Sequence, residues 1–349
     1  MVHTLVTSLS ATWQPFVLVA GLLLIGYAAS REGLFEALGA WCARVRGGGV
    51  TLFVVMMLAV AVVSAVLNLD SSIVFMTPVA ISAARAKGSD EKAFVFGTVF
   101  MANSASLLLI GSNLTNILVI ANTSTSPAHF SARMALPWII AVAVVIGVVL
   151  VWRWRPLTAP LTQGARDAAT LRVGPGVVAT AVAVVLMVVV RHPALEILAA
   201  GVLSQLWTLS RARGGSWKEA LRVVNPGTLA TLFVVAVAVG VLARHWRAPS
   251  HFMAHANVVV TTVVATLSAL VINNLPAASL FAAHAVAHPY AMLLGLDVGP
   301  SCLITGALSS LLWRRIVERD DVKVSLRTFS MVGVIVTAVT IVFALPVLG

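Results

Sequence analysis

Long apolar runs alternate with short polar connections along almost the whole chain. The runs cover residues 13–30, 50–67, 71–84, 93–111, 117–122, 135–152, 173–190, 194–209, 228–243, 256–272, 276–287, 299–313 and 328–346. A helix needs about 20 mostly apolar residues to cross the hydrocarbon core of a bilayer. Several runs meet that length, so the pattern predicts a helical protein that crosses a membrane many times.

Two pairs of runs differ from ordinary neighbouring spans. The runs 50–67 and 71–84 are separated by the polar residues around Asn68 and Asp70, and the runs 256–272 and 276–287 are separated by Asn273 and Asn274. Neither separator contains Lys or Arg, which loops that reach the cytoplasm usually carry. We therefore expect each pair to be a re-entrant hairpin, which returns to the side of the membrane from which it entered.

The distribution of Lys and Arg favours the hairpins. With both hairpins in place, and with 93–122 as one broken span, 19 of the 23 Lys and Arg residues fall on one side, within 31–46, 85–92, 153–172, 211–222 and 314–327. Lys and Arg concentrate on the cytoplasmic side of membrane proteins. This arrangement therefore places the N-terminus outside. The four remaining cationic residues lie on the outer side and are Arg133, Arg191, Arg244 and Arg247.

Each hairpin is followed by a span with a polar interruption. The first interruption covers residues 112–116 and the second covers residues 305–310. The first hairpin enters from the cytoplasm and the second from outside, so the hairpin and the broken helix occur twice in opposite orientations. Inverted repeats with broken helices at the membrane midplane are typical of secondary transporters. The expected fold class is an all-α polytopic membrane protein with inverted repeats.

The same pattern divides the chain into five parts. Residues 33–46 are amphipathic and predict a helix on the cytoplasmic surface. The remaining boundaries follow the hairpins and the breaks. The expected parts are the first scaffold span with the amphipathic helix (1–49), transport repeat 1 (50–126), scaffold spans (127–250), transport repeat 2 (251–316) and a C-terminal span (317–349).

The composition agrees with a membrane protein and excludes other classes. Of the 349 residues, 60% are hydrophobic and 10% are charged, and the mean hydropathy is +1.00. A soluble domain carries roughly 25% charged residues, so this chain is neither a soluble enzyme nor a nucleic-acid-binding protein. Cys42 and Cys302 cannot form a disulfide framework or a metal cluster. A membrane-embedded enzyme would need paired acids or a His-rich metal site at depth, so we expect no catalytic residue, metal or cofactor.

Asp70 is the only acidic residue that this arrangement places deep in an apolar stretch. Glu196 and Asp297 fall near the outer ends of spans. A lone carboxyl group at such depth is costly and usually functional, which indicates a proton carrier or an ion ligand at the first hairpin tip. The alternative is a helix N-cap, in which Asp70 accepts from the free amides at the start of 71–84.

Amides and hydroxyls gather at the four polar breaks. They are suited to hydrogen-bond a small polar solute, or else to cap the ends of the half-helices. No Lys or Arg lies inside a hairpin or a broken span, which makes a neutral polyhydroxy solute a natural fit. The expected solute-binding residues are Asn68, Ser71, Ser112, Asn113, Asn116, Asn273, Asn274, Thr305 and Ser309.

All eight histidines fall on the outer side of this topology. His255, His284 and His288 are alternative proton carriers, because histidine titrates near neutral pH. The other explanation is that they are polar anchors at the membrane interface. Cys302 precedes the second break, and packing is the favoured explanation for this thiol.

Four segments resemble a known family in the same order. NLDSSIVFMTPVAI and ANSASLLLIGSNLTNILV in the first half, with INNLPAASLFAAHAV and DVGPSCLITGALSSLLW in the second, are similar to arsenite/antimonite efflux permeases of the ion-transporter superfamily. The likeness runs from about residue 31 to the end. Two features depart from the family: Leu69 stands between Asn68 and Asp70, and the extra N-terminal span or spans of the family are missing.

The resemblance implies an elevator-type transporter in the bacterial cytoplasmic membrane. The hairpins and broken helices would move as a transport domain against a scaffold that forms a homodimer. The substrate would be arsenite or antimonite as the neutral trivalent hydroxide, exported in exchange for protons, with Asp70 as the proton-coupling residue. The same architecture serves carriers of small organic anions, such as dicarboxylates, and sodium/proton antiporters, which remain the alternatives.

Overall fold

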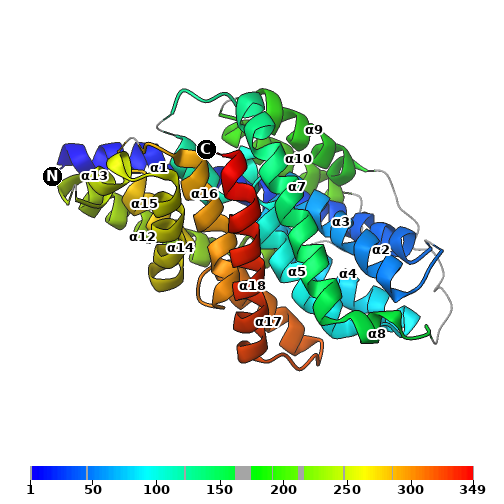
Figure 1. The fold of residues 1–349 in the computed structure, drawn as a ribbon. Helices are drawn as coiled ribbons and strands as arrows, with labels where there is room; N and C mark the ends of the chain where they lie inside the picture. Colours follow the sequence, from blue (N-terminus) through cyan, green and yellow to red (C-terminus); the bar gives the residue numbers. More distant parts are fainter. Residues whose placement is uncertain are drawn as a thin grey trace.

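A computed structural model describes residues 2–44, 46–121, 123–161, 174–190, 192–210, 216–246, 248–284 and 286–348. Within these residues the regular structure is entirely helical (Figure 1). Six of the arginines that the sequence pattern assigns to a side of the membrane lie outside the described residues, namely Arg166, Arg172, Arg191, Arg211, Arg213 and Arg247.

The helices follow the apolar runs, with a few short additions. The α-helices are α1 (Val2–Arg31), α2 (Leu34–Arg44), α3 (Gly49–Leu67), α4 (Leu69–Lys87), α5 (Glu91–Ala105), α6 (Leu114–Ile120), α7 (Pro127–Trp152), α8 (Trp154–Thr158), α9 (Pro175–Val189), α10 (Ala194–Ser210), α11 (Trp217–Val224), α12 (Pro226–His245), α13 (Ala248–His255), α14 (Val258–Ile272), α15 (Asn274–Phe281), α16 (Pro289–Val298), α17 (Leu308–Arg319) and α18 (Leu326–Ala344). Three 3₁₀ turns complete the fold: η1 (Ile110–Ser112), η2 (Gly299–Cys302) and η3 (Leu345–Val347).

Five helical stretches among the described residues are long and apolar enough to cross a bilayer. They are Trp13–Arg31, Gly49–Leu67, Pro127–Trp152, Trp217–His245 and Leu326–Val347. Shorter apolar helices cover Pro175–Val189, Ala194–Ser210 and Val258–Ile272. Helices of this kind satisfy their backbone hydrogen bonds internally, which a segment in lipid requires. The lengths of these helices agree with the polytopic membrane protein expected from the sequence.

One residue joins the two helices of each expected hairpin. Asn68 connects α3 to α4 with φ 85°, and Asn273 connects α14 to α15 with φ 73°. Asparagine tolerates positive φ better than most residues, and its side chain can cap the helix that follows. Asn68 Oδ1 accepts from the Ser71 amide at 2.8 Å, and Asn273 Oδ1 accepts from the Leu275 amide at 3.4 Å. Both helix pairs also pack against each other.

Both broken helices contain a 3₁₀ turn and an irregular stretch, and both breaks end on an extended residue. After α5, residues 106–109 leave the helix, η1 follows, and Asn113 is extended (φ −149°) before α6 begins. After α16, η2 comes first, residues 303–307 are not helical, and Ala307 is extended (φ −141°) before α17 begins. Each break therefore starts six residues earlier than expected, at 106 instead of 112 and at 299 instead of 305. Pro300 explains the second early start, because proline lacks the N–H that an α-helix needs.

Small residues allow α1 to pack closely against two neighbours. A Cβ atom added to Gly201 of α10 would lie 2.7 Å from the Gly21 carbonyl oxygen of α1. A Cβ atom added to Gly176 of α9 would lie 2.5 Å from the Ala29 amide nitrogen. Close backbone approach through small residues is typical of helix packing in membranes. It groups α1, α9 and α10 into one bundle, and α12 also packs against α1.

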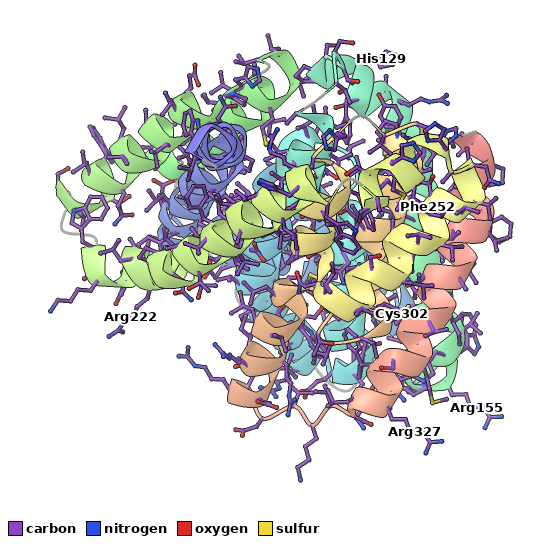
Figure 2. The ribbon with its side chains drawn as sticks, turned by 90° about the vertical axis from the view of Figure 1, so that its left-hand side faces the viewer. His129, Arg155, Arg222, Phe252, Cys302 and Arg327 are labelled. Carbon is purple, nitrogen blue, oxygen red and sulfur yellow. The ribbon has the colours of Figure 1, made fainter. Side chains whose placement is uncertain are left out.

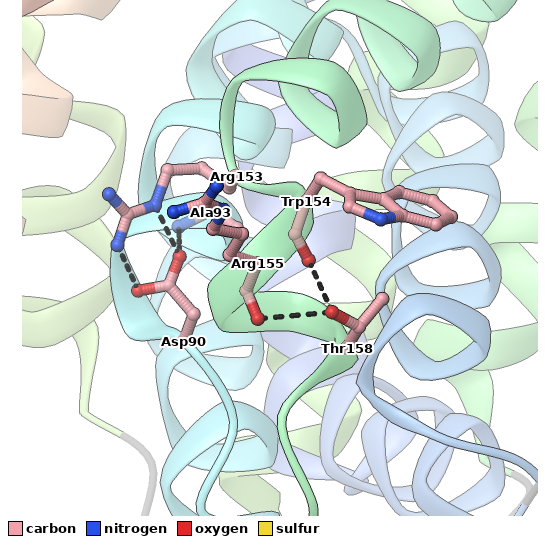
Figure 3. Close-up of polar contacts among 6 residues, drawn as sticks. All are labelled: Asp90, Ala93, Arg153, Trp154, Arg155 and Thr158. Carbon is pink, nitrogen blue, oxygen red and sulfur yellow. Dashed lines mark hydrogen bonds and ion pairs between the residues drawn. The ribbon is translucent and has the colours of Figure 1, made fainter.

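Helix α7 packs mainly against α5 and α18, and it also contacts α9. Its end is also tied to the start of α5 by an ion pair, which Figure 3 shows: Arg153 Nε and Nη2 donate to Asp90 Oδ2 and Oδ1 at 2.6 and 2.8 Å. Asp90 also caps α5 by accepting from the Ala93 amide at 3.2 Å. The hydrogen bond to Asp90 raises the pKa of the Arg153 guanidinium, so the guanidinium stays charged at any physiological pH. The grouping of α7 with the scaffold spans stays a prediction.

The labelled residues with ionisable side chains separate along the vertical direction of Figure 2. Figure 2 shows Arg155, Arg222 and Arg327 in the lower half of the view, and His129 at the top. The sequence pattern assigns these arginines to the cytoplasmic side and His129 to the outer side. The amphipathic helix α2 packs against α3 and α4, with the Phe35 ring stacked on Phe75 at 4.7 Å.

Candidate functional site

A cavity lies where the hairpin tips meet the second halves of the broken helices. The first turns of α4, α6, α15 and α17 all reach it, and α12 closes one side. Its accessible volume is about 30 Å³. A water molecule needs about 10–15 Å³ by this kind of measure, so the cavity suits a compact solute. The lining residues are Leu69, Asp70, Asn113, Leu114, Leu232, Asn273, Asn274, Leu275, Ala307, Leu308 and Ser309.

The electrostatics of this cavity combine one acid with several helix N-termini. The free N–H groups at a helix N-terminus carry a partial positive charge and attract oxygen atoms. Four helices begin at the cavity wall. An asparagine side chain caps one amide in each of α4, α6 and α15, whereas α17 has no side-chain cap. Among the described lining residues there is no Lys, Arg or His, and Asp70 is the only residue with an ionisable side chain.

Asp70 faces the cavity from the first turn of α4. The cap of this helix is Asn68, whose Oδ1 accepts from the Ser71 amide. The interpretation of Asp70 as the N-cap is therefore wrong, because Asp70 lies two residues after Asn68, which already fills that role. The Asp70 carboxyl group is partly exposed and forms no hydrogen bond or ion pair with any described residue. It is free to bind a proton or a solute.

Three of the expected asparagines line the cavity, and each is held differently. Asn113 Nδ2 donates to Ser106 Oγ at 3.2 Å and to Asp297 Oδ1 at 3.0 Å. Asn273 Nδ2 donates to the Thr305 carbonyl oxygen at 3.2 Å. The Asn274 backbone amide donates to the Gly306 carbonyl oxygen at 3.1 Å, while its side-chain amide has no partner among the described residues. The second hairpin tip is thus bonded directly to the second break.

Other expected residues close the breaks or lie beneath the cavity. Asn116 Nδ2 donates to the Ser106 and Leu109 carbonyl oxygens, and the Ser112 hydroxyl donates to the same two oxygens. The Thr305 side chain is exposed, and only its carbonyl oxygen takes part in the site. Asn68 and Ser71 are buried outside the lining, whereas Ser309 lines it with a hydroxyl that has no partner in the described part of the chain.

Asp297 is a second deep acid, which the sequence pattern misplaced. It lies in the last turn of α16, immediately before the second break, and its side chain is 1% exposed. The prediction that Asp70 is the only deep acid is therefore wrong. The error follows from the position of the break, since an α16 that ends at residue 298 puts Asp297 at a broken helix end instead of the outer end of a span. Gly299-Pro300 was the sequence signal that could have located this end.

The remaining candidates lie away from the cavity. His255 Nδ1 pairs with the His251 carbonyl oxygen at 2.9 Å, and neither His284 nor His288 lines the cavity. The Cys302 thiol is buried, 3.9 Å from the Gly333 carbonyl oxygen. That contact agrees with a packing role for Cys302.

Comparison with known proteins identifies relatives along most of the chain. The family described as citrate transporter (CitMHS) matches residues 2–303. An uncharacterized transporter of Mycobacterium tuberculosis is 24% identical over 372 residues, which cover 95% of this chain and 85% of the relative. The arsenical pump membrane protein of Yersinia enterocolitica is 25% identical over 362 residues, which cover 93% and 83%. The crystal structure of the YdaH transporter of Alcanivorax borkumensis has a similar fold, with a TM-score of 0.63, 15% identity and coverage of 99% and 86%.

Proposed function

This chain belongs to the CitMHS citrate transporter family of the ion-transporter superfamily, and from that premise we propose that it exports arsenite or antimonite in exchange for protons. Members of the family are membrane transporters, and the several apolar helices make this chain a multi-pass membrane protein. The transported species is the neutral trivalent hydroxide. It binds in the cavity between the hairpin tips and the broken helices.

The chemistry of the cavity wall carries this proposal. A trihydroxide has three O–H donors and three oxygen acceptors on one small centre. Asp70 and the asparagine carbonyls accept from the hydroxyls, while side-chain amides and helix N-termini donate to the oxygens. A neutral solute also needs no cation in the wall, which agrees with the absence of Lys and Arg among the described lining residues. The 25% identical arsenical pump membrane protein supports the same substrate.

Competition for Asp70 explains the exchange with protons. A carboxylate in this small cavity needs a donor, because an unpaired buried charge is costly. Either a proton or the hydroxyls of the solute can satisfy it, and the two exclude each other. The carrier therefore moves outward with solute and returns with a proton. The form that has neither solute nor proton on Asp70 carries a buried charge and does not cross the membrane.

In this proposal the site crosses the membrane by an elevator mechanism, which the order of the helices supports. The series of hairpin, broken helix and long helix occurs first as α3 to α7 and again as α14 to α18. Two inverted copies would bring their breaks to the same depth in the membrane. The bundle of α1, α9, α10 and α12 would be the fixed scaffold and would form the homodimer, with α12 contributing Leu232 to the cavity wall. The N-terminus would lie outside the bacterial inner membrane.

A carrier of a small carboxylate is the second candidate function. The family description names citrate, and four helix N-termini at the cavity also favour an anion. A carboxylate would meet the charge of Asp70, so it would bind only when Asp70 is protonated. The carboxylate and the proton would then cross in the same direction, whereas the trihydroxide and the proton are proposed to cross in opposite directions.

Transport assays with three probes separate the two candidates. Proteoliposomes that contain the purified protein would be given arsenite, antimonite or citrate under an imposed pH gradient. We expect arsenite and antimonite to move against the proton flow and citrate to stay. Citrate uptake that moves with the protons, without arsenite movement, would replace the proposed function by the second candidate. Protein-free liposomes provide the control for passive leakage of the neutral hydroxides.

A further inference from the structure

Asp297 joins the two broken helices at a buried contact. Its Oδ1 accepts from Asn113 Nδ2 at 3.0 Å and from the Thr115 hydroxyl. Asn113 and Thr115 belong to the first break, whereas Asp297 ends the first half of the second broken helix. One carboxyl group thus fixes two side chains of the opposite repeat, and one of those two, Asn113, lines the cavity.

A negative charge on Asp297 would have no counterion in the described part of the chain. α16 packs against α5, α6, α14, α15, α18 and η2. No described Lys, Arg or His side chain on these elements pairs with Asp297, and Asp70 lies on the cavity side of Asn113. The titratable or charged residues on these elements, none of which bonds to Asp297, are Glu91 and Lys92 in the first turn of α5, Tyr290 in α16, Cys302 in η2 and Arg327 in the first turn of α18.

The hydrogen bonds at this contact also argue against a charged carboxylate. Asp297 Oδ2 and Asn103 Oδ1 are both buried without a partner among the described residues. Asn103 Nδ2 donates to Ser301 Oγ at 3.3 Å, close to Asp297 along the chain. With Asp297 ionised, Oδ2 would share a buried negative charge without accepting a hydrogen bond from any described residue. A proton on Oδ2 removes that charge, and a neutral buried group costs far less than an ionised one.

We propose that Asp297 stays a neutral carboxylic acid during transport and is a positioning residue, which holds Asn113 and Thr115 at the cavity wall. The proposal rests on the proposed function only for the identity of the solute that Asn113 contacts. It assigns different roles to the two deep acids. Asp70, which faces the cavity, exchanges its proton with the solute, whereas Asp297, which is sealed behind Asn113, keeps its proton and fixes the geometry.

Infrared spectroscopy of the purified protein tests the protonation state without any substrate. We expect the carbonyl stretch of a protonated carboxyl group in the parent protein in neutral and mildly alkaline buffer. The part of this band that remains in Asp70→Asn belongs to Asp297 and should be absent from the double variant Asp70→Asn with Asp297→Asn. A parent protein without the band in neutral buffer would overturn the proposal. Loss of the band on addition of sodium ions would also overturn it, because the site would then hold a cation.

Transport kinetics test the positioning role with arsenite as the probe. Asp297→Asn reproduces the shape of the neutral acid and should keep KM within about twofold and leave the pH profile unchanged, because its amide oxygen still accepts from both donors. Asp297→Ala and Thr115→Val should raise KM by roughly tenfold with a smaller effect on kcat, as expected when one or two positioning hydrogen bonds are lost. A flattened pH profile in Asp297→Asn would instead make Asp297 the exchanged proton site and overturn the proposal. If the parent protein moves no arsenite, the proposed function fails, while the infrared result still decides the state of Asp297.

Discussion

The side chain of Asn274 is the most direct probe of solute contact at the scale of single residues. It lines the cavity and has no side-chain partner among the described residues, so its removal breaks no hydrogen bond of the protein itself. Asn113 and Asn273, in contrast, donate hydrogen bonds to other residues of the protein. Their substitution would change the local structure as well as solute binding. This difference makes position 274 the better choice for mutation.

Asn274→Ala should raise the KM for arsenite by about tenfold while the thermal stability of the protein stays the same, because one hydrogen bond to a solute is worth roughly 1 kcal/mol or more. The matched control is Thr305→Ala, whose side chain is exposed and does not line the cavity. Uptake measured in proteoliposomes over a range of arsenite concentrations checks both variants. Equal KM values in Asn274→Ala and Thr305→Ala would remove Asn274 from the solute site.

The sequence predicted which kinds of residue build the site, but it could not separate solute contacts from caps. Asn113 and Asn116 are three residues apart on the same break, and both carry the same amide. Only the packed structure shows that Asn113 reaches the cavity, whereas Asn116 bonds the carbonyl oxygens of residues 106 and 109. Hydrogen bonds between distant segments, such as the one from Asn113 to Asp297, leave no local pattern in the sequence.

At the scale of elements, the second break depends on how closely α18 approaches it. A Cβ atom added to Gly333 of α18 would lie 1.7 Å from the Ser301 carbonyl oxygen of η2. No side-chain rotation relieves a clash between two backbone segments, so one of them has to move. Gly333 therefore sets the position of η2, which follows Asp297 directly.

Gly333→Ala should lower the thermal stability of the purified protein by about 1–3 kcal/mol, the usual range for overpacking a tight core. It should also reduce transport, because η2 and the second break shift together. Gly147→Ala in α7 is the control, since nothing lies within 4 Å of a Cβ atom there, and alanine is the better helix former. Thermal unfolding in detergent measures both variants. A Gly333→Ala protein as stable as Gly147→Ala would show that the close contact with η2 is absent.

The apolar runs predicted the existence of most helices well and their ends less well. The junctions between α3 and α4 and between α14 and α15 were located to within a few residues, because the asparagine between two apolar runs is a strong local signal. Helix α13 was not expected, since Ala248–His255 is short and contains polar residues. Both breaks begin earlier than the polar residues that marked them, because Ser106 and Pro300 end the preceding helices before the asparagine or glycine clusters are reached.

At the scale of the whole molecule, the two sides of the membrane can be assigned by surface labelling. Arg46 is exposed and Lys87 is half-buried, and the two flank the α3–α4 hairpin. His129 is exposed and lies at the top of Figure 2, whereas Arg155 lies near the bottom. Both native cysteines are buried, so they give little background. A hairpin requires that Arg46 and Lys87 face the same side, because a re-entrant pair starts and ends there.

Arg46→Cys and Lys87→Cys should react with a membrane-impermeant thiol reagent from the same side, and His129→Cys should react from the other. Intact cells and inverted vesicles provide the two directions of access. Labelling of positions 46 and 87 from opposite sides would make α3 and α4 a plain crossing. The inverted repeat would then be lost, together with the mechanism that depends on it.

Proton movement driven by arsenite in proteoliposomes tests the competition at Asp70 most directly. A trapped pH-sensitive dye reports the protons, and arsenite is added on one side without an imposed gradient. We predict that the parent protein moves protons against the arsenite flow, and that Asp70→Asn, which keeps the size of the side chain but cannot titrate, still exchanges arsenite for arsenite without moving protons. Proton movement by Asp70→Asn equal to that of the parent would contradict the exchange mechanism at this residue.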